Sequence, residues 1–454
     1  MDNAEKKALG PKGKFFTGHT KMFQADPLGF MSDLAAEYGE VAKFRFGPSQ
    51  KVYFISNPEM IKEVLVTKQN HFVKSDDFKS MKPIVGEGLL TSEKEFHLRQ
   101  RRMIQPSFKK TDIMKYGQDM IDIAKSYTSA WKGGEERIIT HDMMDLTLAI
   151  VSKTMFSKEF EDGYQIIGDS IETSMRMAIK RMRNLFSLPL WIPTKNNRKF
   201  KKAVKQLDNV LYSLIGERRE GMGSEKDMLE ILLAARSEDG IGMTDTQVRD
   251  ELMTIFLAGH ETTANALSWT LYLLSQNPEA EGKLYREIDE LLGDKSPRPE
   301  DFMKLTYTQN VVWESLRMYP PGFFTGRKVE KDIEINGYKF KKNDMVLTSQ
   351  YIMHRKSEFF PEPEKFIPER FENNYLRTIP SFAYFPFGGG PRVCIGNHFA
   401  LMEAVLVLAA ILQKYKLVLS PGQIVKPFPS ITLRPKGGLR MVVEERKQIA
   451  GDIE

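Results

Sequence analysis

The sequence contains one cysteine among its 454 residues. A lone thiol rules out a disulfide within the chain, and it rules out a zinc or iron–sulfur site built from several thiolates. Cys394 is therefore left with three uses: a core residue, a nucleophile or a single metal ligand.

Long hydrophobic runs are absent as well. Residues 1–30 carry charged side chains throughout, and the longest apolar stretches, such as Ala404–Leu412, are too short to cross a bilayer. Together with the scarcity of cysteine, this pattern predicts a cytoplasmic protein without an integral membrane anchor.

The sequence also lacks internal repeats and low-complexity linkers. Hydrophobic residues make up 41% of the chain and charged residues 28%, which is enough apolar material for a large core. We therefore expect a single domain over residues 1–454.

Acidic residues are missing from one stretch of this basic chain, whose net charge is +6. Residues 173–207 contain ten Lys or Arg and no Asp or Glu, together with several Met residues. A solvated pair of basic helices is the simpler interpretation, and weak peripheral contact with a membrane is the alternative. No zinc-finger spacing or other nucleic-acid-binding motif accompanies the charge, so we expect no nucleic acid partner.

Two segments predict β-hairpins. Residues 41–55 alternate or run apolar on both sides of Gly47–Gln50, and Asn336-Gly337 favours a type I′ turn between two short apolar segments. Further strands are expected at Met345–Gln350, Leu417–Leu419 and Leu439–Val443.

Helical periodicity dominates the middle of the chain. Apolar residues recur at spacings of three and four from about residue 100 to 292, and loops are expected near Pro189, Pro193 and Gly221–Ser224. A capping box at Thr244 and Gln247 opens a helix of about 50 Å that continues to Asn277. With an apolar helix at Asn397–Tyr415, the predicted class is mainly α with small β-sheets (α+β).

The cysteine follows a glycine-rich loop and precedes that last helix. Glycines let the backbone approach a flat ligand closely, and a helix N-terminus lowers the pKa of a nearby thiol. The loop resembles the haem-binding loop of the cytochrome P450 family, Phe-x-x-Gly-x-Arg-x-Cys-x-Gly, at Phe387, Gly390, Arg392, Cys394 and Gly396.

The resemblance implies a fold in which haem b lies between the long central helix and the cysteine loop. It implies that Cys394 is the proximal iron ligand, that Phe387 packs near its sulfur and that Arg392 pairs with a haem propionate. His97, Arg101 and a further Arg, Arg327, resemble other propionate-facing positions, although a His at the first of these makes a pH-dependent contact.

Two more segments are similar to family motifs. Glu314-x-x-Arg317 and the later Arg370 imply a buried structural network. The long helix contains Ala258-Gly-His-Glu-Thr-Thr263, where Gly and Thr are poor helix formers, and Thr262 can bond the carbonyl four residues earlier. This segment resembles the family's acid–alcohol pair, which implies that Glu261 and Thr262 deliver protons.

These motifs imply a monooxygenase that inserts one atom of dioxygen into a hydrophobic small molecule, a fatty acid, terpenoid or steroid. A peroxide-using haem-thiolate enzyme and a non-catalytic haem-binding sensor are the alternatives. Because no dinucleotide fingerprint is present, a separate ferredoxin, flavodoxin or reductase is expected as electron donor. The basic residues that could steer an acidic carrier are Arg99, Arg102, Lys109 and Lys110.

By the same resemblance, Met81–Leu90 and Met175–Phe186 are among the segments that would line the substrate pocket. Lys43, Arg45 or Lys51 could hold a substrate carboxylate at its mouth.

Overall fold

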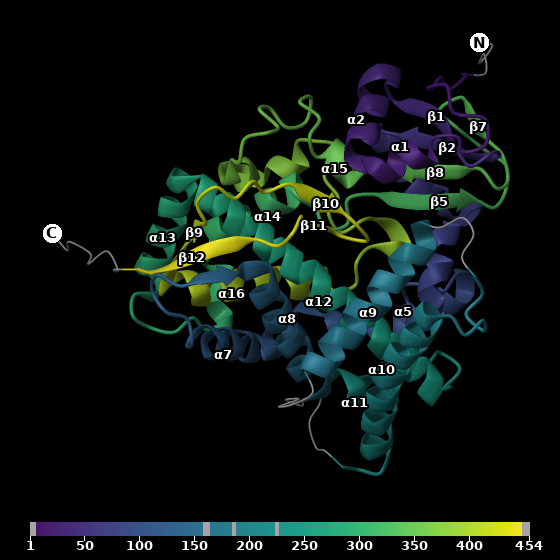
Figure 1. Ribbon diagram of the computed structural model, residues 1–454. Coiled ribbons are helices and arrows are strands. Elements are labelled where there is room, and N and C mark those ends of the chain that lie inside the picture. Colours follow the sequence, from purple (N-terminus) through teal and green to yellow (C-terminus); the bar gives the residue numbers. More distant parts are fainter. Residues whose placement is uncertain (1–5, 158–163, 184–187, 223–226, 447–454) are drawn as a thin grey trace. The chain divides into compact units, whose positions relative to one another are not determined.

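The computed structural model describes residues 6–157, 164–183, 188–222 and 227–446 (Figure 1). Parts of two predicted features, Phe186 and Gly223–Ser224, lie outside these residues. The helices are α1 Thr20–Ala25, α2 Pro27–Tyr38, α3 Pro58–Lys62, α4 Lys82–Val85, α5 Lys94–Ile104, α6 Lys110–Ile113, α7 Gly117–Thr128, α8 Ile139–Phe156, α9 Tyr164–Arg183, α10 Lys195–Arg219, α11 Met228–Ala234, α12 Asp245–Gln276, α13 Pro278–Leu292, α14 Thr306–Met318, α15 Gln350–Met353 and α16 Asn397–Leu412.

The strands are short. They are β1 Val41–Phe46, β2 Gln50–Ile55, β3 Phe72–Lys74, β4 Glu136–Ile138, β5 Thr325–Val329, β6 Ile333–Ile335, β7 Tyr338–Phe340, β8 Met345–Thr348, β9 Tyr415–Leu419, β10 Pro427–Pro429, β11 Leu433–Pro435 and β12 Arg440–Glu445. The predicted class, mainly α with small sheets, is confirmed.

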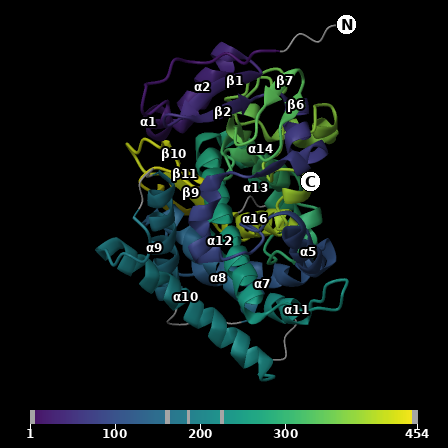
Figure 2. The same ribbon diagram turned by 90° about the vertical axis from the view of Figure 1, so that its right-hand side faces the viewer.

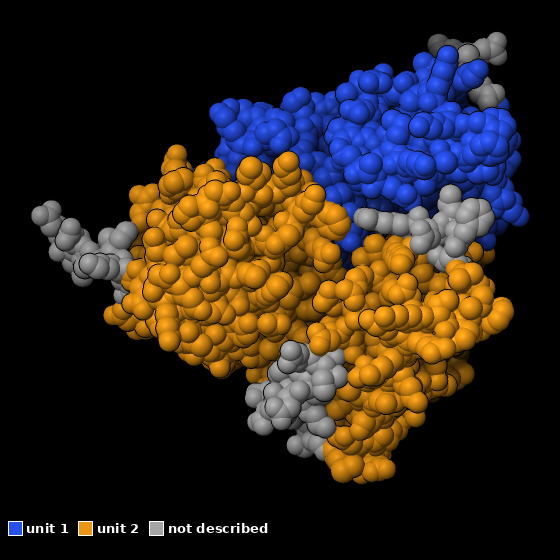
Figure 3. Space-filling view, viewed as in Figure 1, with its two compact units in different colours: residues 1–76, 313–394, 429–433 blue, residues 77–312, 395–428, 434–454 orange. Residues whose placement is uncertain are grey.

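The chain divides into two compact units, each assembled from separate stretches of sequence (Figure 3). Unit 1 comprises residues 1–76, 313–394 and 429–433, and unit 2 comprises residues 77–312, 395–428 and 434–454. The boundary at 394 and 395 separates Cys394 from the residue that follows it. The expectation of a single domain stays a prediction.

Unit 1 is built on a five-stranded sheet of order β1-β2-β8-β5-β3. The predicted hairpin at 41–55 is confirmed as the antiparallel pair β1 and β2, and β8 then pairs parallel to β2, with Val52 opposite Met345. The Asn-Gly hairpin is confirmed as well, since β6 and β7 pair and both turn residues, Asn336 and Gly337, have positive φ.

Unit 2 is helical and centres on α12, which packs against α8 and α16 (Figure 2). The capping box forms as predicted: Thr244 accepts the Gln247 backbone N–H, and the Gln247 side chain accepts that of Thr244. A three-stranded sheet of order β4-β12-β9 completes the unit. Among the described residues, none of the helices has both the length and the hydropathy needed to cross a bilayer.

Several predicted boundaries are wrong. The strands expected at Leu417–Leu419 and Leu439–Val443 are present but run over Tyr415–Leu419 and Arg440–Glu445. The helix from Asn397 ends at Leu412, before the expected Tyr415, because Tyr415 begins β9 and its hydroxyl donates to the Thr128 carbonyl at 3.1 Å. The strand from Met345 ends at Thr348, because Ser349 caps α15.

Candidate functional site

The loop that carries Cys394 has its shape fixed by backbone hydrogen bonds within unit 1. The Cys394 N–H donates to the Phe387 carbonyl at 2.9 Å, and the Val393 N–H donates to the Gly390 carbonyl at 3.0 Å. Gly390 has φ +66°, and a Cβ there would lie 2.0 Å from the Leu65 carbonyl oxygen, so this position requires glycine. The Cys394 side chain is exposed at the end of this constrained loop.

Aromatic side chains connect this loop to α14. The Phe387 ring packs edge-on against Trp313 with centroids 6.0 Å apart, and the Tyr384 hydroxyl donates to the Trp313 carbonyl at 2.7 Å. His354 is fully buried, and its Nε2 accepts the Phe385 N–H at 2.9 Å. Burial and the nearby guanidiniums lower the pKa of His354, which keeps the ring neutral and able to accept this bond.

The predicted network at Glu314 is present and fully buried. Arg317 makes a two-pronged contact with Glu314, at 2.7 and 2.9 Å, and neither side chain is exposed. Arg370 donates to the same carboxylate at 3.3 Å. Arg317 also donates to three backbone carbonyls, at His354, Pro363 and Lys365, so it ties α14 to the segment 354–365.

In unit 2, α12 is buried over most of its length but is open at residues 258–262. Ala258 is exposed, and Gly259, Glu261 and Thr262 are half-buried. The Thr262 hydroxyl donates to the Ala258 carbonyl at 2.5 Å, as predicted. Thr270 makes the same bond to the carbonyl four residues earlier, but it is buried. Exposure therefore distinguishes Thr262 from Thr270, because the Thr262 hydroxyl can exchange its hydrogen bond to the Ala258 carbonyl for one to water.

His260 holds the open segment 258–262 of α12 against α8. The ring is buried, its Nε2 lies 3.1 Å from the Met144 carbonyl, and the Thr147 hydroxyl donates to the His260 carbonyl at 3.1 Å. Burial lowers the pKa of His260 to about 4, so the ring is neutral at physiological pH and Nε2–H is the donor. Glu261 and Thr262 follow on a backbone that α8 holds in place.

The other predicted site residues lie on separate elements. His97 and Arg101 share one face of α5 in unit 2, and His97 is buried. Arg327 lies in β5 and Arg392 in the cysteine loop of unit 1, and both are half-buried. Gly396, half-buried, immediately precedes α16, which begins three residues after Cys394.

Arg45, one candidate for holding a substrate carboxylate, is used otherwise. Its guanidinium donates to the backbone carbonyls of Lys14, Phe15 and Pro48.

Sequence reasoning missed a buried acid in α16. Glu403 is fully buried, and burial raises its pKa well above the usual range, so the side chain is a neutral acid. The Thr263 hydroxyl, on α12, partly offsets this rise. The available signal was a single acid within the apolar run 399–412.

A second missed acid lies on α12. Glu251 is fully buried and accepts the Leu89 N–H at 2.9 Å, while its neighbour Asp250 accepts the Glu87 N–H at 2.8 Å. Burial raises the pKa of Glu251 to about 8, and the Asp250 carboxylate adds to the rise. Two adjacent carboxyl groups thus hold the 87–89 loop on α12, and the Glu251 carboxyl is protonated at neutral pH.

Glu251 should make the unfolding free energy depend on pH. Its carboxyl keeps a proton up to about pH 8 in the folded protein and loses it near pH 4.5 in the unfolded chain. The stabilisation from this proton is fully present below the unfolded pKa and is lost as the pH rises through the folded pKa.

Glu251→Gln keeps an acceptor for Leu89 but cannot ionise, so its free energy of unfolding, measured with urea, should not show this decline of a few kcal/mol. Glu290→Gln, on the exposed side of α13, is the matched control and should retain the wild-type slope. Equal slopes in wild type and Glu251→Gln would contradict the assignment.

Comparison with known proteins places the chain in one family. The cytochrome P450 family model matches residues 9–441. Cyclooctatin synthase of Streptomyces melanosporofaciens is 34% identical and covers 96% of this chain and 95% of that protein. Pentalenene oxygenase of Streptomyces avermitilis is 31% identical and covers 94% and 95%. The crystal structure of the cytochrome P450DA heme domain has a TM-score of 0.89 at 26% identity, covering 98% of this chain and 99% of that one.

The chain belongs to the cytochrome P450 family. It is a P450 monooxygenase, an oxidoreductase of a family that uses haem. Its residues fit that cofactor: the loop presents one exposed thiol, the single thiolate that a haem iron takes, and Arg392 lies two residues before it.

Proposed function

We propose that this enzyme inserts one oxygen atom from dioxygen into a polycyclic terpenoid, using haem b held by Cys394 and electrons from a separate acidic carrier protein. The observation that carries the proposal is the exposed thiol on a loop constrained by backbone bonds, together with the buried Glu314–Arg317 network of the same unit. The carboxylate-binding groups would be Arg392, Arg327, Arg101 and His97, and Phe387 would pack near the sulfur. Bound haem supplies oxygen activation, and the thiolate ligand favours cleavage of the O–O bond.

The reaction consumes two protons and two electrons for each oxygen atom inserted. Glu261 and Thr262 would bring the protons, because both lie in the open segment 258–262 of α12. The Thr262 hydroxyl can pass a proton to or from water. The neutral His260 ring holds the segment 258–262 in place without adding a charge beside Glu261. Beyond Thr262, on the buried side of α12, lie Thr263 and the neutral acid Glu403 of α16.

Thr262→Ala should uncouple electron consumption from product formation. Without the hydroxyl the proton path is broken, so we expect product per electron to fall at least about tenfold, with peroxide taking its place. Thr270→Ala removes the same type of backbone bond at a buried position and should keep coupling at the wild-type level. NADPH consumption, peroxide and product are measured together. Unchanged coupling in Thr262→Ala would exclude this residue from the proton route.

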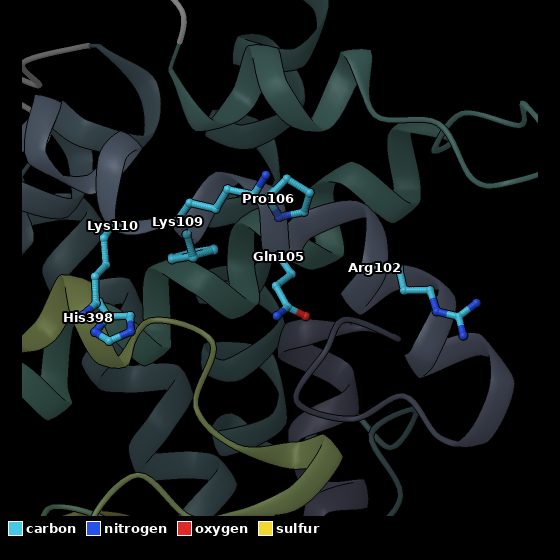
Figure 4. Close-up of a pocket in the computed structure, with 7 residues that line it drawn as sticks. Arg102, Gln105, Pro106, Lys109, Lys110 and His398 are labelled. Atoms are coloured by element: carbon cyan, nitrogen blue, oxygen red, sulfur yellow. The ribbon is translucent and has the colours of Figure 1, made fainter.

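An open basic pocket in unit 2 supports the choice of an acidic carrier. It measures about 470 Å³, and its lining includes Arg102, Lys109, Lys110 and His398. Figure 4 shows Lys110 and His398 close together at one end and Arg102 at the other. Burial and Lys110 lower the pKa of His398, so the positive charge comes mainly from Lys109 and Lys110, because Arg102 is paired with Glu238 at 2.9 Å. His398 is four residues from Cys394, a span of at most about 14 Å along the chain.

Reversing charge at this pocket should slow reduction by an acidic carrier. Lys109→Glu/Lys110→Glu should lower the second-order reduction rate at low salt by about tenfold or more. Lys201→Glu/Lys202→Glu is the matched control, because it makes the same charge change on exposed α10. Stopped-flow reduction at several salt concentrations should show the rates converging as salt screens the pocket. Equal slowing by both pairs would mean that net charge alone steers the carrier.

The terpenoid assignment rests on the relatives, one named cyclooctatin synthase and another pentalenene oxygenase. The direct test is a panel of polycyclic terpenes, fatty acids and steroids of similar size, assayed with a reductase system, with peroxide alone and with neither. Oxidised terpene in the reductase arm is expected. Turnover with peroxide alone would favour the peroxide-using alternative, and turnover in no arm would favour a sensor.

A further inference from the structure

A short loop near the N-terminus exposes two aromatic rings. Phe15 and Phe16 are 78% and 77% exposed, and their rings are stacked edge to face with centroids 4.9 Å apart. Single exposed apolar residues are common on protein surfaces, but two adjacent and almost fully exposed phenyl rings leave a concentrated apolar patch in water.

The fold holds these rings outward. Lys14 and Gly18 exchange two backbone hydrogen bonds, at 3.1 and 2.9 Å, which close a tight loop around Phe15, Phe16 and Thr17. Gly18 has φ +54°, and a Cβ there would lie 2.4 Å from the Arg45 carbonyl oxygen, so the loop is pressed against β1. The aromatic tip therefore stands on an ordered base.

Arg45 completes this base. One of its Nη atoms donates to the Lys14 and Phe15 carbonyls at 2.9 and 3.2 Å, and the other donates to the Pro48 carbonyl at 2.8 Å. The His19 N–H also donates to the Arg45 carbonyl at 2.8 Å. Because the backbone beneath the rings is already ordered, inserting them into another phase costs little conformational entropy.

The surrounding charge indicates what the rings would enter. Residues 6–25 include five lysines and no acid, and Lys12, Lys14 and Lys21 are exposed beside or close to the tip in sequence. Aromatic rings flanked by lysines match an anionic lipid surface, where the rings enter the acyl boundary and the ammonium groups remain among the headgroups. A protein partner would need an acidic rim around an apolar socket.

We propose that the Phe15–Phe16 loop inserts into anionic membranes and docks the enzyme peripherally on them. The inference does not depend on the substrate or on haem chemistry. It places the contact at the N-terminal loop, not at the basic segment 173–207, for which membrane contact was the alternative to a solvated pair of helices.

The test is sedimentation of the full-length holoenzyme with phosphatidylcholine vesicles, with and without phosphatidylglycerol. We expect binding to the anionic vesicles. Phe15→Ser/Phe16→Ser should weaken this binding by about tenfold or more, because the variant lacks the two rings that would be buried in the membrane. Replacing Lys12, Lys14 and Lys21 by Gln should remove the preference for anionic lipid. Ile424→Ser, which removes a 79% exposed apolar side chain, should bind like the wild type.

Two further measurements make the result decisive. Phe16→Trp should show a blue-shifted emission increment with anionic vesicles, whereas Trp191→Ser, in the basic segment, should retain vesicle binding. The proposal is overturned if the wild type does not bind vesicles or if the double Ser variant binds equally well. It is also overturned if that variant instead dissociates a dimer in sedimentation velocity, because a second copy would then cover the rings.

Discussion

Cys394→His should abolish the strongly red-shifted Soret band of the reduced carbonyl complex and eliminate monooxygenase turnover. The thiolate donates electron density that an imidazole does not, so the spectral position and the chemistry should be lost together. The constrained loop should survive, because its hydrogen bonds at this position come from the backbone.

Haem content measured beside the spectrum separates loss of the ligand from loss of the cofactor. Ile395→Val, at the next position, is the control and should keep both band and activity. A Cys394→His protein that retained the red-shifted band would end the assignment of Cys394 as the iron ligand.

Arg317→Leu should cause the largest loss of stability among the variants considered. It leaves the Glu314 carboxylate fully buried with only the Ile367 N–H and the longer contact to Arg370, and it strands three backbone carbonyls. Breaking a buried ion pair in this way costs about 3–5 kcal/mol. Glu314→Gln should cost less, because the amide oxygen still accepts from Arg317 and from the Ile367 N–H.

Urea unfolding and the yield of folded holoprotein measure this loss. Lys341→Leu removes a cation from an exposed pair with Asp332 in the same unit, and it should cost at most about 1 kcal/mol. If Arg317→Leu were as mild as Lys341→Leu, the network would not support the fold.

The features that the sequence predicted well have local causes. The capping box at Thr244 and the Asn336-Gly337 turn depend on residues three or fewer apart, so their signals survive in any surroundings. The cysteine loop was recognisable for a related reason, because its glycines and its thiol lie within one short segment.

The features that it missed depend on distant segments. The sequence gives no sign that Glu251 is buried. Its carboxyl accepts the backbone N–H of Leu89, which lies 162 positions earlier in the chain. Arg45 reads as a free surface charge until the Lys14–Gly18 loop folds over it. Tyr415 continues an apolar helix in sequence, but pairing with Glu445 assigns it to a strand.

The discontinuous make-up of unit 1 has a consequence for biosynthesis. Its sheet joins β2 to β8, whose residues Val52 and Met345 are almost 300 positions apart, and residues 77–312 emerge between them. At about 5–20 residues per second, the first strands wait many seconds on the ribosome for their partner. Unit 1 can close only after the Cys394 loop has been translated. Until then, the edge of β2 that β8 later occupies is a site at which nascent chains can aggregate.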